Sequence, residues 1–214
     1  MKDIRAIIID VDSTITTIEG IDWLAARQGP EVSSFVSGLT ELAMSGKATL
    51  EVIFSRRLDA VRPSRIDVEQ LAEAYLGSIS TGAGEVIGAL KAAGIRPVMV
   101  SGGILNAVLP LAKHLGVPDA DVHAVELLFD SAGEFVRHDA TSPLTRQHGK
   151  RTVAETLALP RRIAAVGDGM TDLEMRPAVD WFIAFTGVVT RAEVVRSADA
   201  SVASFHELQE LVLG

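Results

Sequence analysis

Two acidic pairs carry the clearest chemical signal in this chain of 214 residues. Asp10 and Asp12 follow a short apolar run, and Asp168 and Asp172 lie in a glycine-rich turn after another such run. On its own, an Asp-x-Asp pair fits equally well a strand end capped by turn-forming residues. Four carboxylates without cysteine or histidine among them favour magnesium over zinc, because hard oxygen ligands suit magnesium.

A hydroxyl, two glycines and a lysine occupy comparable positions elsewhere in the chain. Ser101 is followed by Gly102 and Gly103 at the end of an apolar run, and Lys150 precedes a predicted helix. Glycine backbone N–H groups can approach an anion closely, although each feature alone also fits an ordinary turn or a surface cation. Clustered carboxylates repel by roughly 4 kcal/mol per pair at about 4 Å, so a shared site with a phosphate would need a divalent cation and the lysine.

Short apolar runs that alternate with helical patterns position these groups. The runs typical of buried parallel strands are 6–9, 95–100, 163–166 and 181–185. The helical patterns between and after them are 82–93, 105–115, 151–157 and 205–213. This alternation predicts a doubly wound, mainly parallel α/β sheet of Rossmann type, with the polar residues gathered at the carboxyl ends of the strands.

One long stretch breaks the alternation. Residues 18–76 have only helical periodicity, and their turn signals predict about four helices. The sequence therefore predicts a core of residues 1–16 and 78–214 and an inserted helical-bundle cap of residues 17–77. A second interruption, 125–136, is typical of a β-hairpin.

Composition excludes several classes of function. The chain has 20 Lys and Arg against 28 Asp and Glu, a net charge of -8, and no basic run, which disfavours nucleic-acid binding. Its apolar runs fall short of the roughly 20 residues that cross a bilayer, so no membrane partner is expected.

The absence of cysteine excludes disulfides and thiol chemistry. With acidic residues close to the N-terminus and no signal-peptide pattern, we expect a cytoplasmic protein that is a monomer or homodimer.

The motifs together resemble a known family. They are DVDST at 10–14, EGID at 19–22, MSGK at 44–47, SGG at 101–103, GK at 149–150 and GDGMTDLEM at 167–175. In this order they are similar to the haloacid dehalogenase superfamily, and within it to phosphoserine phosphatases and their near relatives. The helical insertion after the first strand is similar to the cap of that family, and the likeness covers nearly the whole chain.

The resemblance implies a magnesium-dependent phosphatase that hydrolyses O-phospho-L-serine. It implies that Asp10 is the nucleophile, which forms an aspartyl-phosphate, and that Asp12 is the general acid and then the general base. By the same resemblance, the phosphoryl group would contact Ser101, Gly102, Lys150 and Thr171. Magnesium would be held by Asp10, Asp12 (through its carbonyl), Asp168 and Asp172.

Specificity is expected to come from the cap. The resemblance assigns Glu19 and Arg57 to the ammonium and carboxylate groups of the serine moiety and Met44 to an apolar wall. The Arg56-Arg57 doublet leaves an ambiguity of one position, which the flanking residues resolve in favour of Arg57.

Three other functions fit parts of the pattern. A phosphatase or a phosphotransferase acting on another small phosphorylated metabolite would use the same core. A phospho-accepting signalling receiver also uses clustered acids, a hydroxyl and a lysine, but its acceptor acid lies on a middle strand and it needs no cap. A nucleotide-binding module is disfavoured because neither GxGxxG nor GxxxxGK[ST] is present.

Overall fold

The computed structural model describes residues 3–44 and 50–214 of the chain. At its centre is a six-stranded sheet with the order β3-β2-β1-β6-β7-β8, in which all neighbouring strands are parallel. The strands are β1 (Ala6–Ile9), β2 (Arg96–Ile104), β3 (Val122–Val125), β6 (Ile163–Gly167), β7 (Trp181–Phe185) and β8 (Ala200–Val202). Every residue of β1 and β6 is buried, which explains their uninterrupted apolar sequences.

The four predicted strands are confirmed, and the described residues add two that the sequence did not predict. These are β3 and β8, the edge strands of the sheet. Both are short and contain polar or partly exposed residues. An edge strand is covered less completely than a central one, so its sequence carries a weaker apolar signal.

The prediction for the second strand was wrong at its carboxyl end. We expected this strand to stop at Val100, but β2 continues to Ile104. Its pairing with β3 shifts register between Val100 and Ile104, so residues 101–103 lie in an irregular part of the strand and not in a turn after it. Because of this irregularity, Ser101 and the two glycines lie at the end of the sheet although they are part of the strand.

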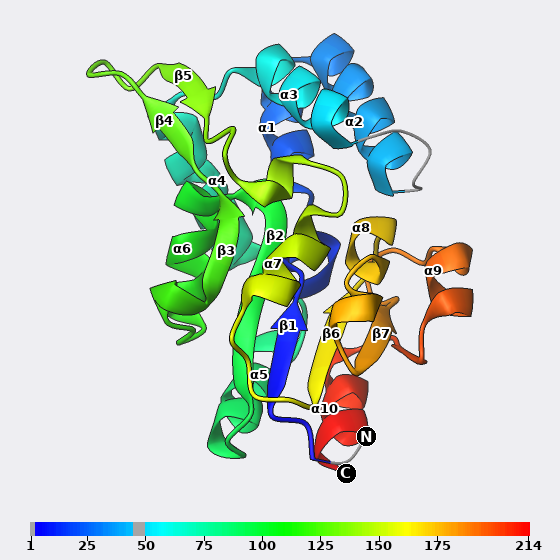
Figure 1. Ribbon diagram of the computed structural model, residues 1–214. Coiled ribbons are helices and arrows are strands. Elements are labelled where there is room, and N and C mark those ends of the chain that lie inside the picture. Colours follow the sequence, from blue (N-terminus) through cyan, green and yellow to red (C-terminus); the bar gives the residue numbers. More distant parts are fainter. Residues whose placement is uncertain (1–2, 45–49) are drawn as a thin grey trace.

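In the described chain helices flank the sheet (Figure 1), four of them at the predicted places and two, over 170–173 and 192–197, that the sequence did not predict. They are α5 (Ala83–Ala92), α6 (Leu105–His114), α7 (Gly149–Thr156), α8 (Met170–Leu173), α9 (Ala192–Ser197) and α10 (Phe205–Leu213). One-turn segments are η1 (Val11–Ile15), η2 (Asp119–Asp121), η3 (Pro143–Thr145) and η4 (Arg176–Ala178). Helix α7 begins two residues before its predicted start, so Lys150 lies in its first turn and not ahead of it.

Between η1 and α5 the described chain contains only helices, as the sequence predicted. They are α1 (Gly20–Arg27), α2 (Pro30–Met44), α3 (Leu50–Val61) and α4 (Arg65–Gly77). Helix α4 starts at a capping box, in which Ser64 Oγ accepts from the Asp67 N–H and the Asp67 carboxylate accepts from the Ser64 N–H. Figure 1 shows α1, α2 and α3 over the carboxyl ends of the central strands, with both chain termini at the opposite end of the sheet.

The predicted hairpin is also present, as the antiparallel pair β4 (Leu127–Phe129) and β5 (Phe135–His138). It lies beside the helices above the sheet (Figure 1), and the Arg65 N–H at the start of α4 donates to the Gly133 carbonyl of its turn at 2.8 Å. Among the described residues, no helix has the length and apolar character needed to span a membrane.

Candidate active site

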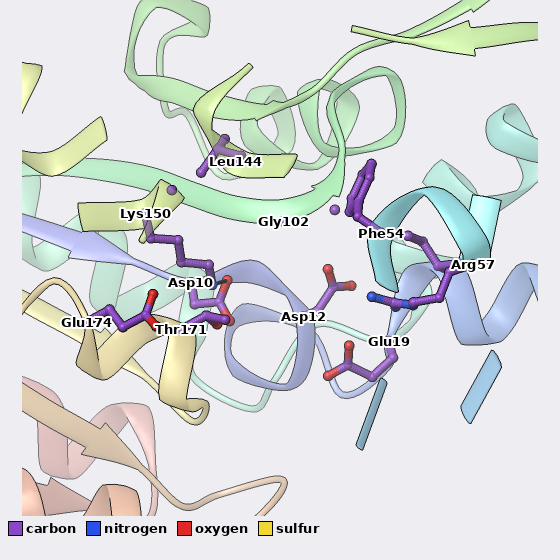
Figure 2. Close-up of a pocket in the computed structure, with 13 residues that line it drawn as sticks. Asp10, Asp12, Glu19, Phe54, Arg57, Gly102, Leu144, Lys150, Thr171 and Glu174 are labelled. Atoms are coloured by element: carbon purple, nitrogen blue, oxygen red, sulfur yellow. Dashed lines mark hydrogen bonds and ion pairs between the residues drawn. The ribbon is translucent and has the colours of Figure 1, made fainter. Parts of the chain in front are cut away.

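A pocket opens where the helices α1 and α3 meet the carboxyl ends of β1 and β2. It has about 560 Å³ of empty space, including its mouth. Figure 2 shows Lys150 and Asp10 toward one end of the pocket, Arg57 and Glu19 toward the other, and Asp12 between them. The parallel strands therefore bring residues from distant parts of the sequence to one place, as the sequence predicted.

Three buried carboxylates form a cluster at the core end of the pocket. Asp10, Asp168 and Asp172 each offer an oxygen within 4.8 Å of the others. Burial and the Asp172 charge raise the pKa of Asp10 well above its usual range, and the same two causes raise the pKa of Asp168 to about 8. Gly167 makes room for the cluster, because a Cβ there would lie 2.2 Å from the Asp172 carboxyl carbon. Three oxygen donors at this spacing fit a hard divalent cation.

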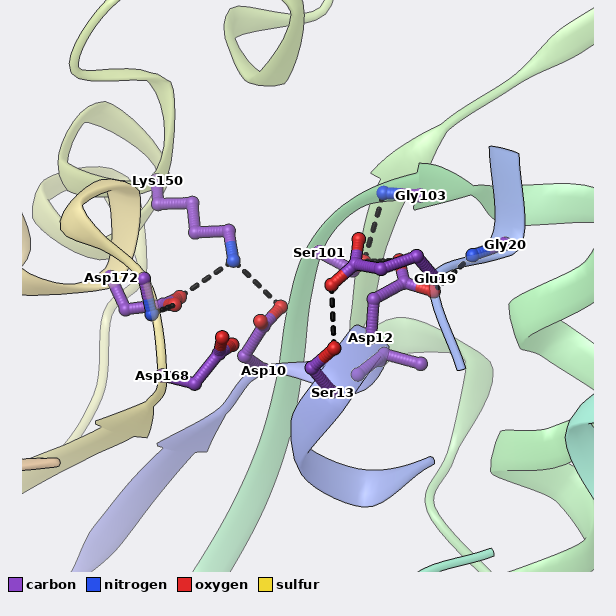
Figure 3. A network of polar contacts seen from close by, with 12 residues as sticks. Asp10, Asp12, Ser13, Glu19, Gly20, Ser101, Gly103, Lys150, Asp168 and Asp172 are labelled. Carbon is purple, nitrogen blue, oxygen red and sulfur yellow. Dashed lines mark hydrogen bonds and ion pairs between the residues drawn. The ribbon is translucent and has the colours of Figure 1, made fainter. Parts of the chain in front are cut away.

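Lys150 is a cation that pairs with two acids of this cluster. Its Nζ lies 2.6 Å from both Asp10 Oδ1 and Asp172 Oδ1 (Figure 3). Burial lowers the pKa of Lys150, but the two carboxylates raise it more, so that its pKa lies above the usual value and the side chain stays charged. A fixed positive charge beside Asp10 is suited to an anionic ligand there.

Asp12 is separate from the carboxylate cluster although it is two residues from Asp10. Its Oδ1 accepts hydrogen bonds from the Gly20 N–H at 2.8 Å and the Tyr75 hydroxyl at 2.6 Å. Burial raises the pKa of Asp12, against the lowering effect of the Tyr75 and Gly20 hydrogen bonds. A carboxyl with a raised pKa that lines the pocket can give and take a proton. The metal contact that the resemblance assigns to its carbonyl stays a prediction.

The residues predicted to hold a phosphoryl group lie around Asp10 and Asp12 in different ways. Gly102 and Thr171 line the pocket, and the Thr171 hydroxyl is buried without a hydrogen-bond partner among the described residues. The Ser101 hydroxyl is buried behind them, where it accepts from the Gly103 N–H at 2.8 Å and is 3.4 Å from Asp12 Oδ2.

The cap side of the pocket holds one carboxyl group, that of Glu19, and one guanidinium group, that of Arg57. Arg57 is only 5% exposed and its Nη2 contacts Asp22 Oδ2 at 3.3 Å, whereas its Nε has no hydrogen-bond partner in the described parts of the chain. Glu19 accepts a 2.6 Å hydrogen bond from Ser13 Oγ. Burial and the nearby Asp12 charge raise the pKa of Glu19 to about 7.

The two arginines of the doublet have different surroundings. Arg57 lines the pocket, whereas the exposed Arg56 lies over the Phe35 ring, with its guanidinium carbon 5.3 Å from the ring centroid. Met44 is the last residue of α2, and its side chain lies outside the described part of the structure, so its predicted place in the pocket stays a prediction.

Sequence reasoning missed several residues at the site. Phe54 and Leu144 line the pocket, and Tyr75 binds Asp12. Arg191 links the core to the cap, because its Nε lies 3.3 Å from Asp168 and its Nη1 lies 3.2 Å from Glu41 on α2. A motif could not have revealed these residues, since each is brought to the site by packing from a distant element.

Comparisons with known proteins identify the family. The family model of haloacid dehalogenase-like hydrolases matches residues 4–180. The chain is 36% identical over 211 residues to the phosphoserine phosphatase of Drosophila melanogaster, covering 95% of this chain and 76% of that protein.

Solved structures extend the likeness to the fold. A phosphoserine phosphohydrolase-like protein from Francisella tularensis superposes with a TM-score of 0.89 at 24% identity, covering 97% of this chain and 99% of the other. A structure described as a phospho-aspartyl intermediate analogue of phosphoserine phosphatase gives a TM-score of 0.84 at 26% identity, covering 99% of this chain and all of the other. This chain therefore belongs to the haloacid dehalogenase-like hydrolase family, and phosphoserine phosphatases are among its relatives there.

Proposed function

We propose that this hydrolase is a Mg²⁺-dependent phosphatase that converts O-phospho-L-serine to L-serine and phosphate. The observation that carries the proposal is that two acids, two residues apart in the sequence, have different hydrogen-bond partners in one pocket. Asp10 lies in the cluster with Lys150, whereas Asp12 is held apart from it by donors of its own. Two carboxyls in different surroundings suit two different roles. The names of the relatives support the same reaction.

In the first step, Asp10 attacks phosphorus and takes the phosphoryl group as an aspartyl-phosphate. The bond between phosphorus and the serine oxygen breaks, and Asp12 gives its proton to that oxygen. Burial, which raises the pKa of Asp12, supports this acid role because it favours the protonated carboxyl.

In the second step, Asp12 takes a proton from a water molecule. The resulting hydroxide attacks the aspartyl-phosphate, and phosphate leaves as Asp10 is regenerated. Asp12 returns to its protonated state, so that the two half-reactions balance.

Lys150, Ser101, the Gly102 N–H and Thr171 hold the phosphoryl oxygens in this proposal. The buried hydroxyl of Thr171, which lacks a partner in the described structure, supports its part, because such a group is costly unless a ligand satisfies it. Lys150 already lies beside Asp10, at 2.6 Å.

The metal in the proposal is Mg²⁺, held by Asp10, Asp168 and Asp172 with the main-chain carbonyl of Asp12. Three converging carboxylate oxygens support this choice, since magnesium prefers oxygen ligands and the cluster contains no nitrogen or sulfur donor. When bound, the ion offsets the mutual repulsion of the acids and the charge that develops on the phosphoryl oxygens.

Glu19 and Arg57 select the substrate. A carboxylate suits the ammonium group of serine, and a guanidinium suits its carboxylate. The buried, unpartnered Nε of Arg57 supports a ligand at this end of the pocket. Phe54 and Leu144 form apolar walls between the charged groups, and Met44 is predicted to add another.

The division into a core of residues 1–16 and 78–214 and a cap of residues 17–77 is part of the proposal. Both connections between the two run side by side, because Thr16 bridges to Ile79 and the Thr17 N–H donates to the Ser78 carbonyl at 2.8 Å. Two adjacent strands of backbone make a natural hinge, so we expect the cap to open there for substrate and close to exclude water.

The test is a steady-state kinetic screen with Mg²⁺ present. It compares L-phosphoserine, D-phosphoserine, phosphothreonine, phosphoethanolamine and sugar phosphates, with and without an added alcohol as acceptor. The proposal predicts the highest kcat/KM for L-phosphoserine and phosphate release that does not depend on the alcohol. Equal turnover of all esters would overturn the assigned substrate, and transfer to the alcohol in preference to water would indicate a phosphotransferase.

A further inference from the structure

Tyr75 is a buried tyrosine whose hydroxyl reaches the acid of the proposed reaction. It lies in the last turns of α4, is 0% exposed and donates to Asp12 Oδ1 at 2.6 Å. The sequence gives no hint of this contact, because 62 positions separate the two residues and no motif includes Tyr75.

The two oxygens of Asp12 have different surroundings. Oδ1 accepts both the Tyr75 hydroxyl and the Gly20 N–H. Among the described residues, Oδ2 has only the Ser101 hydroxyl, at 3.4 Å. Asp12 lines the pocket while Tyr75 and Gly20 do not, so the two donors hold Oδ1 from outside the pocket. Oδ2 lies next to Gly103, which does line the pocket: a Cβ on Gly103 would be 2.7 Å from Oδ2.

Gly20 is adapted to this arrangement. A Cβ at this position would lie 2.1 Å from the Tyr75 hydroxyl oxygen and 3.3 Å from a methyl group of Leu71. A side chain there would displace the hydroxyl from Asp12. The first residue of α1 therefore both donates to the carboxyl and leaves room for the second donor.

The position of Tyr75 is set by packing and not by the pocket contents. Its side chain belongs to the main hydrophobic core, together with Leu71 and Ala72 from the same helix. A donor fixed in this way holds its acceptor in one orientation, since a carboxyl group that is free to rotate would lose the alignment that proton transfer requires.

We propose that Tyr75 is a positioning residue for Asp12: by holding Oδ1 it turns Oδ2 toward the oxygen of the leaving group. This inference rests on the proposed function of Asp12 as general acid. It predicts that Tyr75 matters most for substrates whose leaving group needs a proton, and little for those whose leaving group departs as a stable anion.

The experiment compares the Tyr75→Phe enzyme with the wild type on an alkyl and an aryl phosphate, L-phosphoserine and p-nitrophenyl phosphate. The ratio kcat/KM is the readout because it covers the steps up to the release of the leaving group. We expect about a tenfold loss for phosphoserine and less than about a twofold loss for p-nitrophenyl phosphate. Equal losses for both substrates would overturn the proposal.

A packing variant on the same helix is the matched control. Val68→Ala removes buried volume from α4 about two turns before Tyr75 and leaves Leu71 and the Tyr75 hydroxyl in place, so any loss of kcat/KM should be the same for both phosphates. In an Asp12→Asn background, Tyr75→Phe should add no further loss for phosphoserine, because the two residues act as a unit. An additional tenfold loss there would contradict the inference.

Two further measures keep the result interpretable. If Tyr75→Phe does not fold, 3,5-difluorotyrosine at position 75 keeps the hydroxyl and makes it a more acidic and therefore stronger donor. A change in kcat/KM confined to phosphoserine then supports the proposal, and a change shared by both substrates overturns it. If the wild type does not hydrolyse phosphoserine, the proposed substrate fails, and Tyr75 is tested instead on the best alkyl phosphate of the screen.

Discussion

The two ends of the pocket are built in opposite ways. At the core end, three like charges and one lysine are forced together by the ends of parallel strands and by α7 and α8. At the cap end, Arg57 on α3 is paired with Asp22 on α1, and Glu19 with a hydroxyl. At the core end like charges are held together by Lys150 and Arg191, whereas at the cap end each charged group has a partner of its own. In the proposed reaction the core end carries the chemistry and the cap end the choice of substrate, so variants can separate the two.

The strongest test of this comparison is the loss of the nucleophile. Asp10→Asn should lower kcat by at least about 10³-fold for every phosphate ester, since the core end treats all phosphates alike. The protein should stay folded, because the change removes one of the repelling charges. Steady-state kinetics and a thermal melt check both statements. The exposed Asp59→Asn on α3 is the control, and substantial activity in Asp10→Asn would exclude Asp10 as nucleophile.

Removal of the metal should have the next largest effect. Chelation should abolish turnover, and Mg²⁺ at about 100 times its Kd should stabilise the fold by about 2.7 kcal/mol. For a protein of this size that corresponds to a rise in Tm of roughly 5–10 °C. Differential scanning fluorimetry with and without Mg²⁺ measures it. Asp172→Asn should reduce the Tm shift, and an unchanged shift would place the ion elsewhere.

A third prediction concerns the cap end alone. Arg57→Ala should lower kcat/KM for L-phosphoserine by about a hundredfold, as expected for the loss of a buried charged contact, but by much less for phosphoethanolamine, which has no carboxylate. The neighbouring Arg56→Ala is the matched control and should leave both values near wild type. If the two variants exchange these effects, the arginine that faces the substrate is Arg56.

The smallest predicted effect is a pH dependence confined to the amino group of the substrate. Because burial and the Asp12 charge raise the pKa of Glu19 to about 7, Glu19 is ionised above that pH and neutral below it. Binding of the ammonium group should weaken as the pH falls from 8 to 6.

The measurement is the ratio of kcat/KM for L-phosphoserine to that for 3-phosphooxypropionate, which is phosphoserine without its amino group. We expect the ratio to fall by about tenfold over this range. In Glu19→Gln the ratio should be low and independent of pH. A wild-type ratio that stays constant from pH 8 to 6 would argue against Glu19 as the ammonium partner.

Much of the core could be predicted from the sequence because its signals are local. The apolar runs of β1 and β6 are buried on both faces, and a motif of adjacent residues follows each of them. The cap helices were also predictable from their periodicity. The apolar pattern did not predict the edge strands β3 and β8, because their burial is incomplete. It also did not predict that β2 continues through the irregular segment Ser101–Gly103.

The sequence alone determined the acids and the lysine of the core end and that parallel strands would bring Asp10 and Asp168 to one edge, because short motifs of adjacent residues follow the apolar runs. Only the tertiary structure decided how those groups are oriented. It placed Lys150 between two acids, paired Arg57 with Asp22 and joined Tyr75 to one oxygen of Asp12. These contacts depend on the packing of helices against a sheet, and packing is a property of three-dimensional shape that no spacing in the sequence encodes.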